Sequence, residues 1–372
     1  YTTLFRSGEL MKVTFPHMGN MYIPLKSLFE QLGVEVVVPP PTTKKTLDLG
    51  VKYSPEFACL PLKLTIGNFI EAFSLGANTI IMAGGIGPCR FGYYGEVQRE
   101  ILKGLGFEFE MIILEPPRGH FLDLMKQLRR IFNNKNCTLK AITALLLDEI
   151  DKIVSRVRPS ELYPGDTDKV YQHIVNITDR AGNEMEIMDI KNGVRCMFEK
   201  IPRGSFNVLP KIGLVGEIYT ILEPFSNLYI EKHLGELGAE VQRSIYITDW
   251  IRENLFPTFL RSKDHARMLD LAKPYINCFV GGHGQETVAE TVRFSQEGYA
   301  GVIHILPFTC MPEIVAKSVL PQVSRESSIP VMTIVLDEHS AETGLRTRLE
   351  AFIDMIKFKL EAENYDEMLA EN

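Results

Sequence analysis

The sequence predicts an α/β protein in which two domains, each built on a parallel β-sheet, are related by an internal repeat, with a mainly helical insertion between them. The first observation is an order of strand, loop, amphipathic helix, glycine and strand that occurs at residues 12–38 and again at residues 211–241. The second is a helix, glycine, strand and cysteine that follow in each copy, at residues 64–89 and 286–310. This alternation is typical of βαβ units, whose strands pair in parallel.

The first copy begins with a strand at residues 12–15 and a helix near residues 22–32. Gly33 ends that helix, because a glycine after an apolar helical pattern readily adopts the left-handed conformation of a helix C-terminus. The remaining predicted elements of this copy are a strand at 34–38, a helix at 64–74, a strand at 78–83 and a helix at 96–103.

The second copy repeats this plan and closes the chain. Its predicted strands lie at 211–215, 239–241, 301–306 and 331–336, and its predicted helices lie at 226–237, 286–296, 313–319 and about 345–360. Cys89 and Cys310 therefore occupy equivalent positions, each between the carboxyl end of a strand and the next helix. Open α/β sheets bind their ligands at this edge.

Four segments follow from these patterns. Residues 1–10 have no apolar period and precede Met11, which we expect to be the natural start, so these ten residues are interpreted as a non-native leader. Residues 11–118 form the first α/β domain, 119–205 the helical insertion and 206–372 the second α/β domain. Within the insertion, residues 121–128 and 145–153 have a helical pattern, and residues 185–198 are predicted to be β-prone, with a turn at Asn192-Gly193.

Composition excludes several classes of function. The chain has 372 residues, of which 45% are hydrophobic, and a formal net charge of −7. An acidic protein is not attracted over most of its surface to nucleic acids or anionic membranes, so we expect neither as a partner. No apolar run reaches the roughly 20 residues that cross a bilayer, and no secretory signal is present, which predicts a cytoplasmic protein.

Three of the six cysteines have a common context. Cys59, Cys89 and Cys310 each stand beside proline or glycine ahead of a predicted helix. Cys137, Cys196 and Cys278 lack such flanks and are interpreted as structural, with Cys278 in a predicted strand. No two cysteines form a C-x-x-C pair, so zinc-ribbon and redox-dithiol sites lose their usual support.

A thiolate that precedes a helix is stabilised by the helix dipole and by unpaired backbone N–H groups. The same N–H groups can donate to the sulfides of an anionic cluster, and glycines such as Gly84, Gly85 and Gly87 let the backbone approach it. Two alternatives stay open on residue patterns alone. Buried cysteines often act as small hydrophobic residues, and the glycines could bind a nucleotide, although no G-x-x-x-x-G-K-[ST] pattern occurs.

Several short blocks resemble the 2-hydroxyacyl-CoA dehydratase D-component family and its activase-related relatives. The blocks are Cys59-Leu-Pro-Leu-Lys63, Gly87-Pro-Cys-Arg-Phe-Gly-Tyr-Tyr94, Gly281-Gly-His-Gly-Gln-Glu286, Pro307-Phe-Thr-Cys-Met-Pro-Glu313 and Thr347-Arg-Leu-Glu-Ala-Phe352. The resemblance covers nearly everything after Met11, and it is nearest to the activase-related branch, whose substrate is generally not assigned.

The resemblance implies a 4Fe-4S cluster held between two Rossmann-like domains by three cysteines, which would be Cys59, Cys89 and Cys310. It also implies a separate ATP-dependent activator protein, a second cluster-bearing subunit or a homodimer, and an acyl-CoA substrate. Low-potential electron transfer is the function we expect, with dehydratase or reductase as reaction class. The alternatives are an iron–sulfur scaffold without enzyme activity and a cluster-free protein that binds a small ligand.

Four charged or titratable residues near these motifs have two interpretations each. His283 could hydrogen-bond the cluster or a ligand or act as an acid or base, or it could simply face solvent in a tight glycine turn. Lys63 and Arg90 could offset cluster charge or attract an anionic substrate, or they could form ordinary surface ion pairs. Glu313 opens the helix after Cys310, where a carboxylate is favourable in any case.

Overall fold

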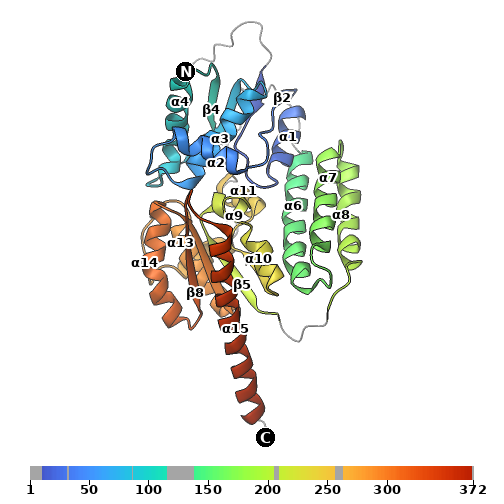
Figure 1. Cartoon of the computed structure of the whole chain (residues 1–372), viewed down its shortest axis with the longest axis vertical. Helices are drawn as coiled ribbons and strands as arrows, with labels where there is room; N and C mark the ends of the chain where they lie inside the picture. Colours follow the sequence, from blue (N-terminus) through green and yellow to red (C-terminus); the bar gives the residue numbers. More distant parts are fainter. Residues whose placement is uncertain are drawn as a thin grey trace. The chain divides into compact units, whose positions relative to one another are not determined.

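A computed structural model describes residues 11–31, 33–85, 87–114, 138–204, 209–255 and 263–370. The chain divides into two compact units, and each contains one four-stranded parallel sheet (Figure 1). Residues 59–61 and 87–89 group with the second unit, although most of the neighbouring chain belongs to the first. The predicted leader at 1–10 and the predicted helical pattern at 121–128 lie outside the described residues.

In the first unit the strand order is β2-β1-β3-β4. The strands are β1 (Lys12–Thr14), β2 (Glu35–Val36), β3 (Thr79–Ala83) and β4 (Glu110–Leu114), and the helices are α1 (Tyr22–Gln31), α2 (Lys44–Tyr53), α3 (Leu60–Ser74), the 3₁₀ helix η1 (Arg90–Tyr93) and α4 (Tyr94–Gly104). The first four residues of β3 are buried, as a central strand covered on both faces requires.

In the second unit the order is β6-β5-β7-β8, which repeats the first sheet strand for strand. The strands are β5 (Lys211–Gly216), β6 (Glu240–Arg243), β7 (Gly301–Pro307) and β8 (Val331–Leu336). The helices are α9 (Ile218–Leu222), α10 (Ile230–Glu236), α11 (Ile247–Leu255), α12 (Lys263–Asp270), α13 (Gly284–Gln296), α14 (Met311–Glu326) and α15 (Glu342–Ala370). The predicted α/β fold with two repeated parallel-sheet domains is confirmed.

The strand order fixes where a ligand site can form. In the second sheet the chain leaves β5 toward β6 on one side, and β7 then lies on the other side of β5. Strand order therefore reverses between β5 and β7, and open α/β sheets bind their ligands outside the carboxyl ends of strands at such a point. Glu217 and Cys310 both lie just after these two strands.

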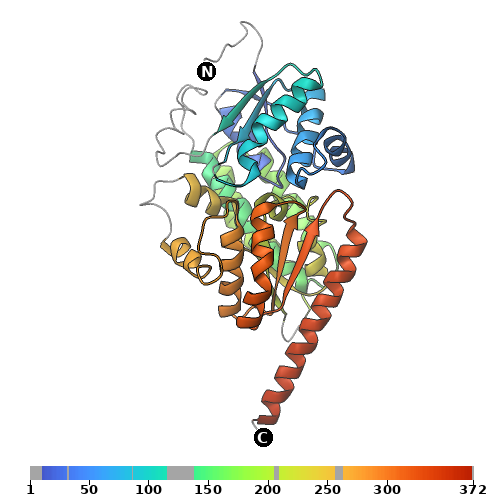
Figure 2. The same cartoon turned by 90° about the vertical axis from the view of Figure 1, so that its left-hand side faces the viewer.

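Two helices of the second unit, α13 and α14, pack side by side, as both views show (Figure 1 and Figure 2). Their contact buries apolar side chains from each helix, including Val288, Val292, Leu320 and Val323. Burial of such a side chain stabilises the fold by about 1.5–3 kcal/mol. The packing therefore holds the first turns of both helices firmly beside the carboxyl edge of the sheet.

The insertion consists of α6 (Thr138–Val157), the 3₁₀ helix η2 (Arg158–Ser160), α7 (Asp166–Arg180) and α8 (Glu184–Glu199). The β-prone prediction for residues 185–198 was wrong, because this stretch forms α8. Asn183 caps the helix by accepting a hydrogen bond from the backbone of Glu186 at 3.0 Å. Ile187, Val194 and Phe198 are buried with helical spacing, which outweighs the turn preference of Asn192-Gly193.

Three other expectations need correction. Cys278 lies in an irregular, exposed segment rather than a strand. The helix predicted at 226–237 begins only at Ile230, after the short helix α9. The closing helix α15 extends well beyond residue 360 and past the end of the second sheet in both views (Figure 2). Among the helices of the described ranges, none is both long and apolar enough for a membrane span.

Candidate functional site

Each of the three predicted cysteines directly precedes a helix. Cys59 stands before α3, Cys89 before η1 and Cys310 before α14. All three belong to the second unit, since residues 59–61 and 87–89 group with it. Cys59 and Cys310 are buried, and Cys89 is half-buried. The structure thus brings the three thiols into one compact unit and gives each the helix-terminal position that the sequence predicts.

Cys310 is the N-cap residue of α14. Its carbonyl oxygen accepts a hydrogen bond from the backbone of Ile314 at 2.9 Å, and Pro312 lies in the first turn, where its missing N–H costs nothing. Thr309, directly before it, has a φ of 67°, which is rare for a β-branched residue. Such backbone strain persists where surrounding contacts impose it, and it is concentrated at functional sites.

The electrostatic surroundings of Cys310 are anionic. Burial raises the pKa of its thiol, and the carboxylates of Glu217 and Glu313 and the thiol of Cys59 raise it further. A hydrogen bond from the backbone N–H of Glu313 opposes the shift. Cys310 without a bound cation is therefore a protonated thiol at neutral pH, and binding of a metal centre requires loss of that proton.

A diglycine turn lies against both Cys89 and the start of α14. Gly281 and Gly282 have positive φ angles of 80° and 50°. A Cβ atom on Gly281 would lie 2.8 Å from the backbone nitrogen of Cys89. One on Gly282 would lie 3.0 Å from Cγ of Pro312 and 3.8 Å from Sγ of Cys89. The turn therefore joins two of the cysteine-bearing segments at distances that side chains would obstruct.

His283 follows this turn as the N-cap residue of α13. The side chain is half-buried, so the expectation that it simply faces solvent does not hold. Burial lowers the pKa of the imidazole, although the carboxylate of Glu313 opposes this shift. His283 is consequently neutral at neutral pH and can donate or accept one hydrogen bond.

Lys63 and Arg90 secure the turn that precedes Cys59. The ammonium of Lys63 donates to the carbonyl of Glu56 at 3.1 Å, and the guanidinium of Arg90 donates to the carbonyl of Phe57 at 3.2 Å. Lys63 is buried, which is unusual for a lysine. These contacts give both residues a structural role in shaping the chain ahead of Cys59.

Two residues of this region, the half-buried Glu217 and the buried His304, are missing from the sequence prediction. Glu217 follows β5, and its side chain accepts hydrogen bonds from the backbone of Tyr219 and Thr220. His304 lies in the fully buried strand β7, and its Nε2 is 2.9 Å from the Glu313 carboxylate. A histidine inside an apolar strand pattern was the available signal, since such a residue needs a buried partner.

The remaining cysteines differ from these three. Cys196 lies on α8 and Cys278 in an irregular segment, and both are exposed. Cys137 lies outside the described residues. Within the described ranges, no three side chains of histidine, cysteine, aspartate or glutamate are grouped to hold a metal ion. The thiols of a 4Fe-4S cluster bind different irons, so they stand further apart than the ligands of one ion.

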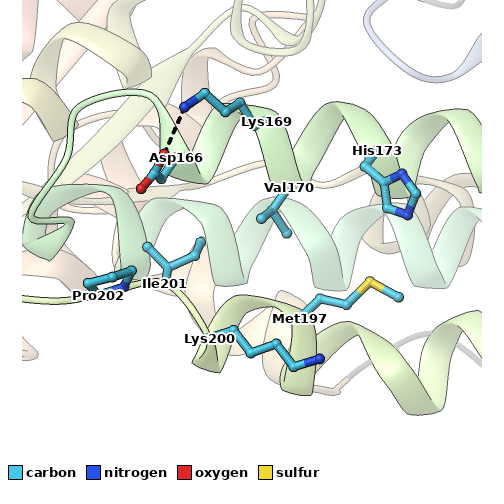
Figure 3. A pocket seen from close by; sticks show the side chains of 8 residues that line it. All are labelled: Asp166, Lys169, Val170, His173, Met197, Lys200, Ile201 and Pro202. Carbon is cyan, nitrogen blue, oxygen red and sulfur yellow. Dashed lines mark hydrogen bonds and ion pairs between the residues drawn. The ribbon is translucent and has the colours of Figure 1, made fainter.

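A separate hollow of about 470 Å³ lies in the helical insertion (Figure 3). It is lined by Asp166, Lys169, Val170, His173, Met197, Lys200, Ile201 and Pro202. Lys169 is ion-paired with Asp166 at 2.9 Å, as the dashed line shows. None of the predicted site residues lines this hollow, so it is distinct from the cysteine site.

Comparison with known proteins gives one family. Residues 16–82 match the family model described as CoA enzyme activase uncharacterised domain (DUF2229). The match includes Cys59 and ends before Cys89. No curated protein gives a significant match. The family match supports the predicted relation to CoA-dehydratase and activase-related proteins for this part of the chain.

Proposed function

We propose that the chain is an iron–sulfur protein that holds one 4Fe-4S cluster with Cys59, Cys89 and Cys310 and handles low-potential electrons. The supporting observation is that three thiols from distant parts of the sequence each precede a helix and group in one unit. Helix N-termini carry unpaired N–H groups and partial positive charge, which favour thiolates and an anionic cluster.

The residues present fit such a cluster in three respects. The donors are thiols, which are the usual ligands of iron–sulfur clusters. Gly281 and Gly282 let the backbone pack closely against the Cys89 segment, and the backbone of Glu313 already donates to the sulfur of Cys310. When bound, the cluster would supply one-electron chemistry, and three thiolates would leave one iron open to a small ligand or substrate oxygen.

The family match supports a CoA-enzyme context. We therefore extend the proposal to a separate ATP-dependent activator as electron donor and to an acyl-CoA as substrate, with a dehydratase or reductase reaction. Either a second cluster-bearing subunit or a second copy of this chain would complete the system.

One observation favours a second candidate function. Burial and neighbouring carboxylates raise the pKa of Cys310, which suits a neutral, structural thiol. The chain would then be a cluster-free protein that binds a small ligand, and the hollow of about 470 Å³ in the insertion offers space for one. An iron–sulfur scaffold without enzyme activity would lie between these two candidates, because it would bind the cluster but catalyse no reaction.

Iron and acid-labile sulfide in protein purified without oxygen test the proposal, together with EPR spectra before and after reduction by dithionite. We expect about four of each per chain and a signal that appears on reduction. Absence of iron from freshly prepared anaerobic protein would instead support the cluster-free candidate. A cluster that passes to an apo-acceptor protein but is not reduced would support the scaffold.

A further inference from the structure

The hollow in the helical insertion has walls that backbone hydrogen bonds hold in place. Its lining comes from the first two turns of α7, from the end of α8 and from the segment that follows α8 (Figure 3). The Glu161 carboxylate accepts hydrogen bonds from the backbone N–H groups of Gly165 at 2.8 Å and Thr167 at 2.7 Å, which fixes the start of α7. The backbone of Leu162 donates to the carbonyl of Pro202 at 2.9 Å. The hollow is therefore preformed, as small-molecule sites usually are.

One part of the lining is apolar and consists of Val170, Met197, Ile201 and Pro202. Ile201 is buried, whereas Val170 and Met197 are half-buried and keep some apolar surface in contact with water. An apolar ligand that covers this surface would be bound by the hydrophobic effect. The unbranched side chain of Met197 can adjust to the shape of such a ligand. The volume of about 470 Å³ lies within the range of about 300–1,000 Å³ that is typical of small-molecule sites.

The charged side chains of the lining leave one positive charge uncompensated. The Lys169 ammonium is 2.9 Å from the Asp166 carboxylate, so these two charges offset each other. Lys200 has no ion-pair partner among the residues that the structure describes. It is the C-cap residue of α8 and follows Met197 by three positions, so both belong to the same turn. A ligand in the hollow therefore meets one free ammonium beside apolar side chains, which favours a single negative charge on the ligand.

We propose that the hollow binds a medium-chain fatty acid, with its hydrocarbon chain against Val170, Met197 and Ile201 and its carboxylate beside Lys200. A fatty acid joins one carboxylate to an unbranched apolar chain, which matches both parts of the lining. A phosphate monoester carries about −1.5 to −2 charges, more than the single uncompensated lysine would balance. Binding is non-covalent. The inference does not depend on the proposed cluster, because none of the three cysteines lines the hollow.

A purely structural role for Lys200 is the alternative. A lysine at a helix C-terminus interacts favourably with the helix dipole, and it does so whether or not a ligand is bound. The two roles are separated by comparing a charged ligand with an uncharged one of the same chain length. A change in the stability of α8 affects the binding of both ligands alike, whereas loss of an ion pair weakens only the binding of the charged one.

The test measures the binding of octanoate and of 1-octanol to the full chain by isothermal titration calorimetry. Lys200→Met removes the charge and keeps a long side chain. Val170→Trp places an indole ring in the hollow. The control is Lys317→Met, because Lys317 is an exposed lysine on α14 that does not line the hollow. Circular dichroism checks that each variant is folded, and iron is measured on the same anaerobic preparations.

We expect wild type and Lys317→Met to bind octanoate equally, and more tightly than 1-octanol. Lys200→Met should weaken octanoate binding about fivefold, as loss of one surface ion pair does, and leave 1-octanol binding unchanged. Val170→Trp should abolish the binding of both ligands, and if it does not fold, Lys200→Met decides.

Three results would overturn the inference: no saturable binding of octanoate to the wild-type chain, equal affinity of wild type for octanoate and 1-octanol, or equal octanoate affinity in Lys200→Met and Lys317→Met. Each of these results leaves the proposed function intact, since that depends on the iron content. Conversely, a chain without iron that binds octanoate as expected would remove the proposed function and keep this inference.

Discussion

The backbone nitrogen of Cys89 lies 2.8 Å from the point where a Cβ atom on Gly281 would stand. These residues are far apart in the sequence, and their approach sets the position of Cys89 relative to α14. Real Cβ atoms do not come this close to a backbone nitrogen, so any side chain at position 281 must displace the Cys89 segment.

Gly281→Ala should therefore destabilise the protein and lower the iron content of anaerobic preparations. The matched control is Gly298→Ala, because Gly298 has a similar φ of 75° but open space around its Cβ position. Both variants incur the cost of a left-handed alanine, about 1–2 kcal/mol. Only Gly281→Ala should also lose iron, and equal iron content in the two variants would contradict the role of this contact.

Alanine at Cys59, Cys89 or Cys310 should each abolish or degrade the cluster, because each removes one of only three proposed thiolate ligands. Cys196→Ala is the control, because Cys196 is exposed on α8 and is not one of the proposed ligands. Cys137→Ala should likewise leave the iron content intact. The measurement is iron per chain, and a similar loss in the controls would refute the ligand assignment.

The sequence was sufficient to predict the features that depend on local pattern. Strand and helix order in both copies follows apolar periodicity, and the position of Cys310 before α14 follows from Pro312 and the end of β7. The partners of buried polar groups were beyond such reasoning. Glu313 meets His304 and Thr287 only because β7, α13 and α14 pack together, and no sequence spacing encodes that contact.

The helix α8 shows a second reason why prediction from sequence failed. Asn192-Gly193 resembles a hairpin turn, yet both residues lie within a helix that Asn183 caps and Phe198 anchors in the core. Intrinsic preferences of single residues amount to about 1 kcal/mol, whereas burial of a large aromatic side chain contributes more. Tertiary packing therefore overrode the turn preference.

Arg243 joins the second sheet to the helical insertion through a buried ion-pair network. Its guanidinium donates to Asp151 of α6 at 2.8 Å and to Glu231 at 2.7 Å, and Tyr171 also donates to Asp151. Arg243→Met should destabilise the protein by about 3–5 kcal/mol, because two buried carboxylates lose their cation. Urea unfolding measures the change.

The control for this variant is Arg195→Met. Arg195 on α8 forms an ion pair at 3.3 Å with Glu149 on α6, the helix that also carries Asp151. In contrast to Arg243, the side chain of Arg195 is exposed. Surface pairs contribute about 0–1 kcal/mol. Similar decreases in the free energy of unfolding for the two arginine variants would mean that the buried network stabilises the protein no more than a surface ion pair does.

Glu286 should make stability fall as pH rises from mildly acidic to neutral. Burial raises the pKa of its carboxyl to about 7, and the carboxylates of Glu313 and Glu290 contribute to the shift. The unfolded chain loses this proton near the ordinary value of 4.5. Between these pH values the folded state binds more protons than the unfolded state, so the free energy of unfolding decreases with pH and levels off above about 7.

Glu286→Gln should flatten this decline, because the amide does not titrate. The free energy of unfolding is measured by urea denaturation at several pH values between 4 and 8, a range that brackets the two pKa values. Glu100→Gln, at an exposed position on α4, should keep the wild-type slope. If Glu286→Gln also keeps that slope, the carboxyl of Glu286 ionises alike in both states, and the pH dependence must come from other buried carboxyls such as Glu217 and Asp148, whose pKa values are raised by burial.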